Sequence, residues 1–346
     1  MGVSGPTPAL PRPRGPLSDA LGARLTGKPG TGAPPAAARS GASGAAADPW
    51  GEDWQLALYI CYELHYRGFA HVDARWEWDP ELLRLRRDLE DGFLAAVRET
   101  LGPVTPLREQ LEQLLIEPIG GSGPSYHLLE NGERWQAREY LAHRSLYHLK
   151  EADPQIWAVA RLHGPAQAAM VAVEYDEYGA GRGDRVHSTL FARMMADFGL
   201  ETAYGHYLDA VPAPALATVN LMSLFGLHRE HRGALVGQFA GVEITSSPGS
   251  DRLARAFARL GAGPDGIAFY REHVEADAVH EQVVRRGVIG ALLADEPQLE
   301  TDIAFGLAAS GLAEDRLAEH IIGSWEAGRS SLLVPLSDAP VHALVV

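Results

Sequence analysis

The stretch FYREHVEADAVHEQVV, residues 269–284, places His273, Asp277 and His280 at positions i, i+4 and i+7. At about 100° per residue, a helix carries these three side chains within an arc of about 60°. Two imidazoles and one carboxylate along one stripe form a metal-binding edge. Glu272 and Glu275 lie nearby, so the spacing alone also fits an exposed acidic face with incidental histidines.

The chain around this stretch has the pattern of an all-α protein. Apolar residues recur at spacings of three and four, as in PELLRLRRDLEDGFLAAVRETL, residues 80–101, which is the periodicity of amphipathic helices. Gly and Pro breaks separate the segments, and we expect about ten helices in a single domain over residues 49–346. Residues 1–48 are rich in Pro, Gly, Ala and Ser, a composition that predicts a disordered tail.

Composition excludes several classes of function. The net charge is −15, which argues against a nucleic-acid partner or an anionic membrane. Cys61 is the single cysteine, so neither an intramolecular disulfide nor a cysteine-built zinc site is available. Residues 1–48 contain no apolar run long enough for a signal peptide or a membrane span, and we expect a cytoplasmic protein. Any metal ligands must be oxygen and imidazole nitrogen.

One helix cannot surround a metal ion, so further ligands must come from other segments. Glu177 and His187 flank a glycine-rich loop that lets two helix ends face one cavity, and Glu151 lies at a predicted helix end. Each could equally be a surface group. Glu243 is the only charged residue in 233–250, and burying a lone carboxylate is costly unless it is paired or bound to a cation. No glutamate is followed by histidine three residues later, which excludes the ferritin-like arrangement.

Taken in order, these residues resemble the ligand set of the haem-oxygenase-like diiron oxidases and oxygenases. The blocks LKEADP, DEYGAG, VHSTLF, NLMSLFGLH, EITSS and EHVEADAVHE are similar to the actinobacterial branch called iron-containing redox enzymes, over roughly residues 125–330. The resemblance implies a haem-oxygenase-like helical bundle that holds two iron ions, with Glu177 as the bridging carboxylate. The implied metal ligands are Glu151, Glu177, His187, Glu243, His273, Asp277 and His280.

The resemblance also implies an activity. A carboxylate at the position of Glu243 is similar to the N-oxygenase members, so Glu177 and Glu243 are the expected catalytic residues of a non-haem diiron enzyme. It would activate O2 and oxidise a small amine or an amino-acid-derived substrate, with electrons from an external donor. Two alternatives stay open: a diiron desaturase or C–C-cleaving oxidase of an aliphatic amine or acid, and a non-enzymatic helical protein that binds haem or another ligand. Whether the chain forms a homodimer is also left open.

Other histidines and glutamates imitate a site by spacing alone. Glu139 and His143 share a helix face at i and i+4, and His148 precedes Glu151 by three residues. We interpret all of them as structural, with Glu139 and His143 as the best candidates for supporting contacts to the ligands.

Overall fold

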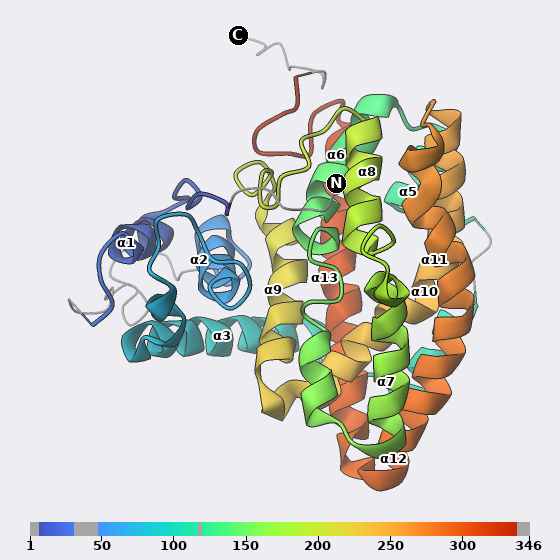
Figure 1. The fold of residues 1–346 in the computed structure, drawn as a ribbon, viewed down its shortest axis with the longest axis horizontal. Coiled ribbons are helices and arrows are strands. Elements are labelled where there is room, and N and C mark those ends of the chain that lie inside the picture. Colours follow the sequence, from blue (N-terminus) through green and yellow to red (C-terminus); the bar gives the residue numbers. More distant parts are fainter. Residues whose placement is uncertain (1–6, 31–47, 117–119, 338–346) are drawn as a thin grey trace.

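The computed structural model describes residues 7–30, 48–116 and 120–337, which contain thirteen α-helices and no strand. The prediction of an all-α protein is confirmed (Figure 1). The count exceeds ten because α1, α4, α5 and α12 are short helices of five to ten residues. The helices are α1 (Pro16–Leu25), α2 (Glu52–Glu63), α3 (Pro80–Leu101), α4 (Leu107–Leu114), α5 (Pro124–Glu130), α6 (Arg134–His148), α7 (Gly164–Glu177), α8 (His187–Asp197), α9 (Ala213–Leu227), α10 (Arg232–Arg259), α11 (Pro264–Gln282), α12 (Ala291–Asp295) and α13 (Glu300–Glu326).

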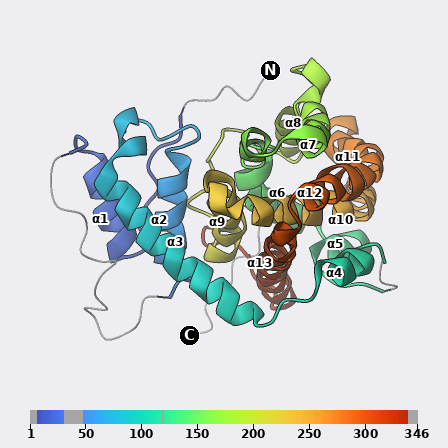
Figure 2. The ribbon, with the colours of Figure 1, turned by 90° about the horizontal axis from the view of Figure 1, so that it is seen from below.

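The long helix α10 packs against both α11 and α13, with α11 at the outer edge of the bundle, and α6, α7 and α8 lie beside these helices (Figures 1 and 2). Helices α10 and α13 approach closely because glycines lie at their crossing. A Cβ atom added to Gly306 would lie 1.9 Å from the carbonyl oxygen of Ala234, a distance that no side chain permits. A π-helical segment, Val283–Gly290, continues α11. None of the described helices combines the length and the apolar composition that a bilayer crossing requires.

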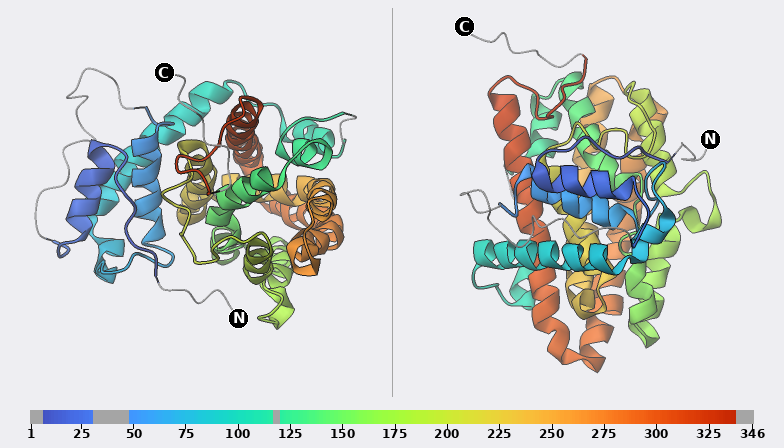
Figure 3. Two further views of the ribbon diagram at one scale, coloured as in Figure 1. Left: turned by 90° about the horizontal axis from the view of Figure 1, so that it is seen from above. Right: turned by 90° about the vertical axis from the view of Figure 1, so that its left-hand side faces the viewer.

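Helices α1, α2 and α3 lie together on one side of the bundle, and α9 lies between them and the other helices (Figure 3). Nine of the twelve residues of α2 are buried, because this helix packs against α1 and α3 as well as α9. The amide of Asn220 in α9 donates to the carbonyl oxygen of Gln55 in α2 at 2.8 Å. This hydrogen bond fixes the position of α2 against the bundle.

The prediction of a disordered tail is wrong for part of residues 1–48. Residues 16–25 form α1, whose Leu17, Leu21 and Leu25 are buried in the core. Asp53 of α2 accepts hydrogen bonds from the backbone N–H groups of Leu17 and Ser18, at 2.9 and 2.8 Å. Three leucines at a spacing of four make an apolar stripe that an average composition over 48 residues conceals. Among the remaining predicted tail residues, 1–6 and 31–47 lie outside the described residues.

Changing Leu21 to alanine is expected to lower the free energy of unfolding by about 3 kcal/mol, because Leu21 is fully buried and its removal leaves a cavity. Urea denaturation followed by circular dichroism measures this change. The same substitution at the exposed Asp19 on the opposite face should cost less than about 1 kcal/mol. Equal stability of the Leu21 variant and the parent protein would show that α1 contributes nothing to the core.

Candidate metal centre

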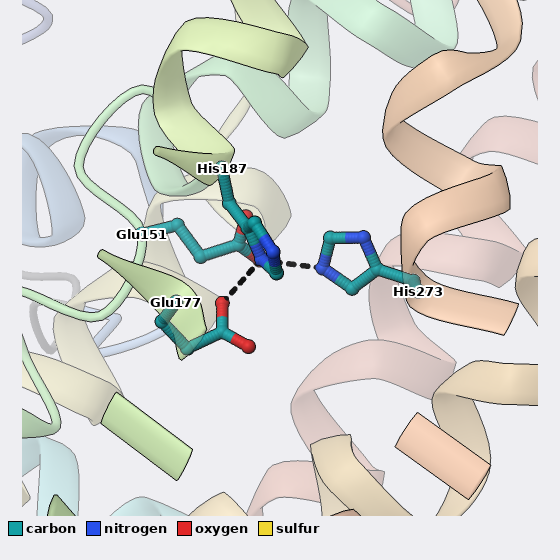
Figure 4. Close-up of side chains that lie close together, drawn as sticks. All are labelled: Glu151, Glu177, His187 and His273. Atoms are coloured by element: carbon teal, nitrogen blue, oxygen red, sulfur yellow. Dashed lines mark ion pairs between the residues drawn. The ribbon is translucent and has the colours of Figure 1, made fainter. Parts of the chain in front are cut away.

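The seven residues singled out in the sequence meet in one buried region of the bundle. They come from five elements: the turn after α6, the end of α7, the start of α8, the middle of α10 and one face of α11. None of the seven is more than 7% exposed. Figure 4 shows four of them, and their side chains point toward one another from different elements. The seven are Glu151, Glu177, His187, Glu243, His273, Asp277 and His280.

These residues divide into two groups that share one carboxylate. In each group the candidate ligand atoms lie within 4.8 Å of one another. One group is Glu151, Glu177, His187 and His273, and the other is Glu177, Glu243, Asp277 and His280. Two neighbouring cation sites with a common carboxylate are the arrangement that this geometry can accommodate.

Glu177 and His187 lie together because α7 ends at the first and α8 begins at the second. The Nδ1 atom of His187 lies 2.6 Å from Oε2 of Glu177. The loop between them closes tightly at Gly179, whose φ is +73°. A Cβ atom at this position would lie 2.6 Å from the backbone nitrogen of Val186. The predicted glycine loop is therefore a requirement of the backbone path.

Glu151 lies in the turn after α6 and is oriented by two features. The next residue, Ala152, has a φ of +73°, a left-handed conformation that is uncommon for residues with a side chain. His148, one turn earlier, lies with Nδ1 2.8 Å from Oε1 of Glu151. Burial, followed by the nearby Arg144, lowers the pKa of His148 to about 3, so at neutral pH it is uncharged and donates its Nδ1–H to Glu151. Oε2 of Glu151 has no hydrogen-bond partner.

The stripe on α11 is oriented by its own backbone and by α10. The Nδ1–H of His273 donates to the carbonyl oxygen of Phe269 at 2.8 Å, which leaves Nε2 free to bind a cation. Ser246 of α10 donates to Oδ2 of Asp277, while Oδ1 of Asp277 lies 3.3 Å from Nδ1 of His280. Contacts of this kind hold metal ligands in position.

His280 is surrounded by carboxylates on both ring nitrogens. Its Nδ1 lies 3.0 Å from Glu243 and 3.3 Å from Asp277, and its Nε2 lies 3.2 Å from Asp176. Burial lowers the pKa of His280, but hydrogen bonds with Asp277 and Glu243 outweigh it and raise the pKa to about 11. The carboxylates around the ring therefore stabilise positive charge at this position.

The carboxylates of the site are held in an environment that disfavours their charge. Burial raises the pKa of Glu177 and of Glu243 to about 8, and that of Glu151 to about 6. Oε2 of Glu151 has no hydrogen-bond partner, and Nδ1 of His187 and Oδ1 of Asp277 lie near an oppositely charged group without a well-aligned hydrogen bond. Buried polar atoms without partners are costly. Divalent cations would both pair the charges and satisfy these atoms, and mixed oxygen and imidazole donors suit iron.

Glu139 and His143 do not have the supporting role that the sequence suggested. Glu139 accepts hydrogen bonds from Trp325 and Ser331, at 2.8–3.0 Å, and from Ser330. His143 contacts the hydroxyl of Ser331 at 2.9 Å. Both side chains fasten the segment that follows α13 onto α6. The contacts to the site come instead from His148, Ser246 and Asp176, and among these only His148 had a helical spacing that could have revealed it.

A cavity of about 490 Å³ lies directly beside the site. Five of the seven residues line it: Glu151, Glu177, Glu243, His273 and Asp277. Its other walls include the aromatic side chains of Tyr147, Phe269 and Tyr270. A cavity of this size accommodates a small organic molecule in contact with the ligand carboxylates.

The metal-free protein is expected to lose stability as the pH rises from 6.5 to 8.5. Glu177 and Glu243 have folded pKa values near 8, above the ordinary value of 4.5, and His280 has one near 11, above 6.5. Over this interval the folded state binds more protons than the unfolded state, so the free energy of unfolding falls. The melting temperature should drop by at least about 5 °C.

The opposing pKa shift of His148, to about 3, lowers stability below pH 6.5, where the unfolded chain binds the proton and the folded chain does not, so it has little effect between pH 6.5 and 8.5. Added ferrous iron needs deprotonated ligands, so it should raise the melting temperature more at pH 8.5 than at pH 6.5. Melting curves with and without iron at both pH values test this, and an iron effect that decreases with pH would contradict it.

Comparison with known proteins agrees with the site. The family described as iron-containing redox enzyme, which is haem-oxygenase-like, matches residues 138–315, a range that contains all seven residues. The nitrosourea synthase of Streptomyces achromogenes subsp. streptozoticus is 28% identical over 219 residues, which are 61% of this chain and 46% of the relative. The chain thus spans about half the length of this curated relative. The family match covers half of the chain, and it confirms the resemblance that the sequence motifs indicated. The chain therefore belongs to the haem-oxygenase-like family of iron-containing redox enzymes.

Proposed function

We propose that this chain is a non-haem diiron oxygenase that uses O2 to oxidise the nitrogen of a small amine or of an amino-acid-derived substrate. The observation that supports this most strongly is the pair of buried ligand groups with Glu177 in common. Residues 49–346 would form its single catalytic domain, and electrons would come from a separate reductase or a small reductant.

The charge of the site favours two divalent ions. Once deprotonated for metal binding, four carboxylates with three neutral imidazoles carry a formal charge of −4, which two ferrous ions would balance. One ion would be held by Glu151, Glu177, His187 and His273, and the other by Glu177, Glu243, Asp277 and His280. When bound, the iron pair would supply the one-electron redox chemistry that O2 reduction requires.

The chain's own residues would orient the ligands and seal the site. The Phe269 carbonyl, His148 and Ser246 fix the positions of His273, Glu151 and Asp277. Phe191 and Phe269 lie against the ring of His148, with ring centroids 4.8 and 5.0 Å away, and they pack this side of the site with apolar rings. Glu177 and Glu243, the proposed catalytic residues, border the cavity, so a substrate nitrogen held there would lie beside them.

Two observations favour nitrogen oxidation. The curated relative is named for the formation of a nitrosourea, and Glu243 supplies an additional buried carboxylate at the site, as in the N-oxygenase members of the family. An additional carboxylate stabilises the higher charge of oxidised iron.

Iron analysis and rapid mixing test the proposal. Protein loaded with ferrous iron without oxygen should contain two irons per chain, and mixing with O2 should produce a transient visible absorption. A preparation with a Soret band and no non-haem iron would instead identify a haem-binding protein. Uptake of two irons without any reaction with O2 would contradict the assignment as an oxygenase.

The Glu243→Ala variant tests the type of oxidation. We expect it to lose the transient absorption and more than about 100-fold of the activity, because the exchange removes a direct ligand and not an outer contact. Iron content and rapid-mixing spectra measure this, and Glu133→Ala, at the exposed start of α6, is the control. If Glu243→Ala keeps a normal transient and forms product, desaturation or C–C cleavage at the same site becomes the better assignment.

A further inference from the structure

The lining of the cavity extends along the helices beyond the candidate metal-binding groups. On each of three helices, two lining residues lie seven positions apart, a distance of roughly 10 Å along a helix. The pairs, written with the far-end residue first, are Tyr270 and Asp277 on α11, Ser250 and Glu243 on α10, and Glu314 and Leu307 on α13. Arg144 on α6 contacts Glu314, and Glu151 follows in the turn after α6. Helices α10 and α11 are in register here, because Ser246 bonds to Asp277 and Ser247 bonds to the carbonyl oxygen of Val274.

The far end carries an ion pair that the metal centre does not use. The guanidinium of Arg144 on α6 donates two hydrogen bonds to the carboxylate of Glu314 on α13, at 2.9 and 2.7 Å. The side chains are 20% and 35% exposed. Among the described residues that line the cavity, these two are the only charged Arg, Lys, Asp or Glu side chains apart from the candidate ligands. The Nε atom of Arg144 is buried and has no hydrogen-bond partner.

We propose that Arg144 and Glu314 bind the carboxylate and the ammonium group of an α-amino acid, whose side chain extends along the cavity toward Glu151, Glu243 and Asp277. This inference rests on the proposed function, because the far end of the bound molecule would be the part that is oxidised. Uncharged polar groups of Tyr140, Tyr270 and other lining residues surround the charged pair. A separation of roughly 10 Å along the helices suits a long side chain, which under the proposed function ends in nitrogen.

The charges select a molecule that carries both signs. A ligand with only a carboxylate would pair with Arg144 and leave Glu314 without a partner. A simple amine would pair with Glu314 and leave Arg144 without a partner. Each case leaves a partly buried charge unpaired, which is unfavourable. A zwitterion pairs both groups at once. The pair therefore determines specificity by rejecting molecules that lack either charge.

An ion pair between two helices can also have a purely structural role, and the chain offers a matched control. Arg232 on α10 pairs with Glu296, just after α12, and these side chains are 18% and 22% exposed. Neither residue lines the cavity. Removal of a charge from this second pair should affect stability without affecting ligand choice.

The experiment measures binding to the full-length chain, loaded with ferrous iron and kept free of oxygen. The twenty common L-amino acids and L-ornithine are screened by thermal shift, and the tightest binder is measured by calorimetry. It is then compared with its decarboxylated amine and with its N-acetyl derivative. We expect the parent protein and Arg232→Gln to bind the amino acid at least tenfold more tightly than either analogue.

In Arg144→Gln the preference for the amino acid over the amine should fall to about one. In Glu314→Gln the preference over the N-acetyl derivative should fall in the same way, which gives a second test if one variant does not fold. Failure of every amino acid to bind would overturn the inference, as would an equal loss of affinity for the amino acid and its analogues in both variants. Iron content is measured on the same samples, so the two proposals can fail separately. Protein that holds two irons but binds no amino acid would refute this inference alone. Protein without iron would refute the proposed function.

Discussion

The Glu177→Gln variant is expected to lose both iron ions, and with them more than about 100-fold of the activity. Glu177 is the one residue that belongs to both ligand groups, so an amide at this position weakens both sites. Outer contacts alone change metal affinity by 10–100-fold, and a shared direct ligand should exceed that range. Iron per chain, measured after anaerobic loading and gel filtration, should fall from two to below one.

The same variant should be more stable than the parent protein when both are metal-free. Burial, followed by the charge of Glu151, raises the pKa of Glu177 to about 8, so ionising this group at pH 8.5 opposes folding. An uncharged glutamine of the same shape removes that cost, and the gain in unfolding free energy should be on the order of 1 kcal/mol or more.

Glu139→Gln is the matched control, because Glu139 is also buried but its contacts are with Trp325 and Ser331. It should retain two irons and be less stable. Unchanged iron content in Glu177→Gln would refute the shared ligand.

The His280→Ala variant should bind less than two irons and show no turnover. His280 is the only imidazole of its group, and its Nδ1 lies within 4 Å of Glu177, Glu243 and Asp277. Without it, the second site retains three carboxylates and no nitrogen donor, a set that suits magnesium or calcium better than iron. Iron analysis together with the rapid-mixing experiment measures the loss.

Two further variants separate a ligand from its surroundings. Asp176→Asn removes the charge next to Nε2 of His280, which lies 3.2 Å away, and should weaken iron binding by about 10-fold. His143→Ala removes a buried histidine whose partner is Ser331 and should leave the iron content at two.

Full iron occupancy and activity in His280→Ala would defeat the assignment of the site.

The sequence predicted the fold class well because helical periodicity is a local property. It failed at α1, where Leu17, Leu21 and Leu25 become buried only because α2 and Asp53 are present to receive them. A short amphipathic segment in a chain rich in Pro and Gly has no stability of its own. Its order therefore depends on a contact that local composition does not contain.

The candidate ligands could be named from the sequence, and the structure brings all seven together. Their supporting contacts could not be named in the same way. Glu139 and His143 had a favourable spacing but face the segment after α13, while Ser246 and Asp176 reach the site from helices distant in the sequence. The direction of a side chain across a helix interface depends on how the helices pack, and spacing within one helix does not encode it.

By itself, the sequence determined that the protein is helical, that His273, Asp277 and His280 share one helix face, and that any metal ligands are oxygen and nitrogen. These properties follow from residue chemistry and from the 3.6-residue period, which act over short distances along the chain. Only the tertiary structure decided which residues share a group with Glu177, that Oε2 of Glu151 has no partner, and that Arg144 and Glu314 line the same cavity. Those properties arise where separate helices meet, and the packing of distant segments sets them.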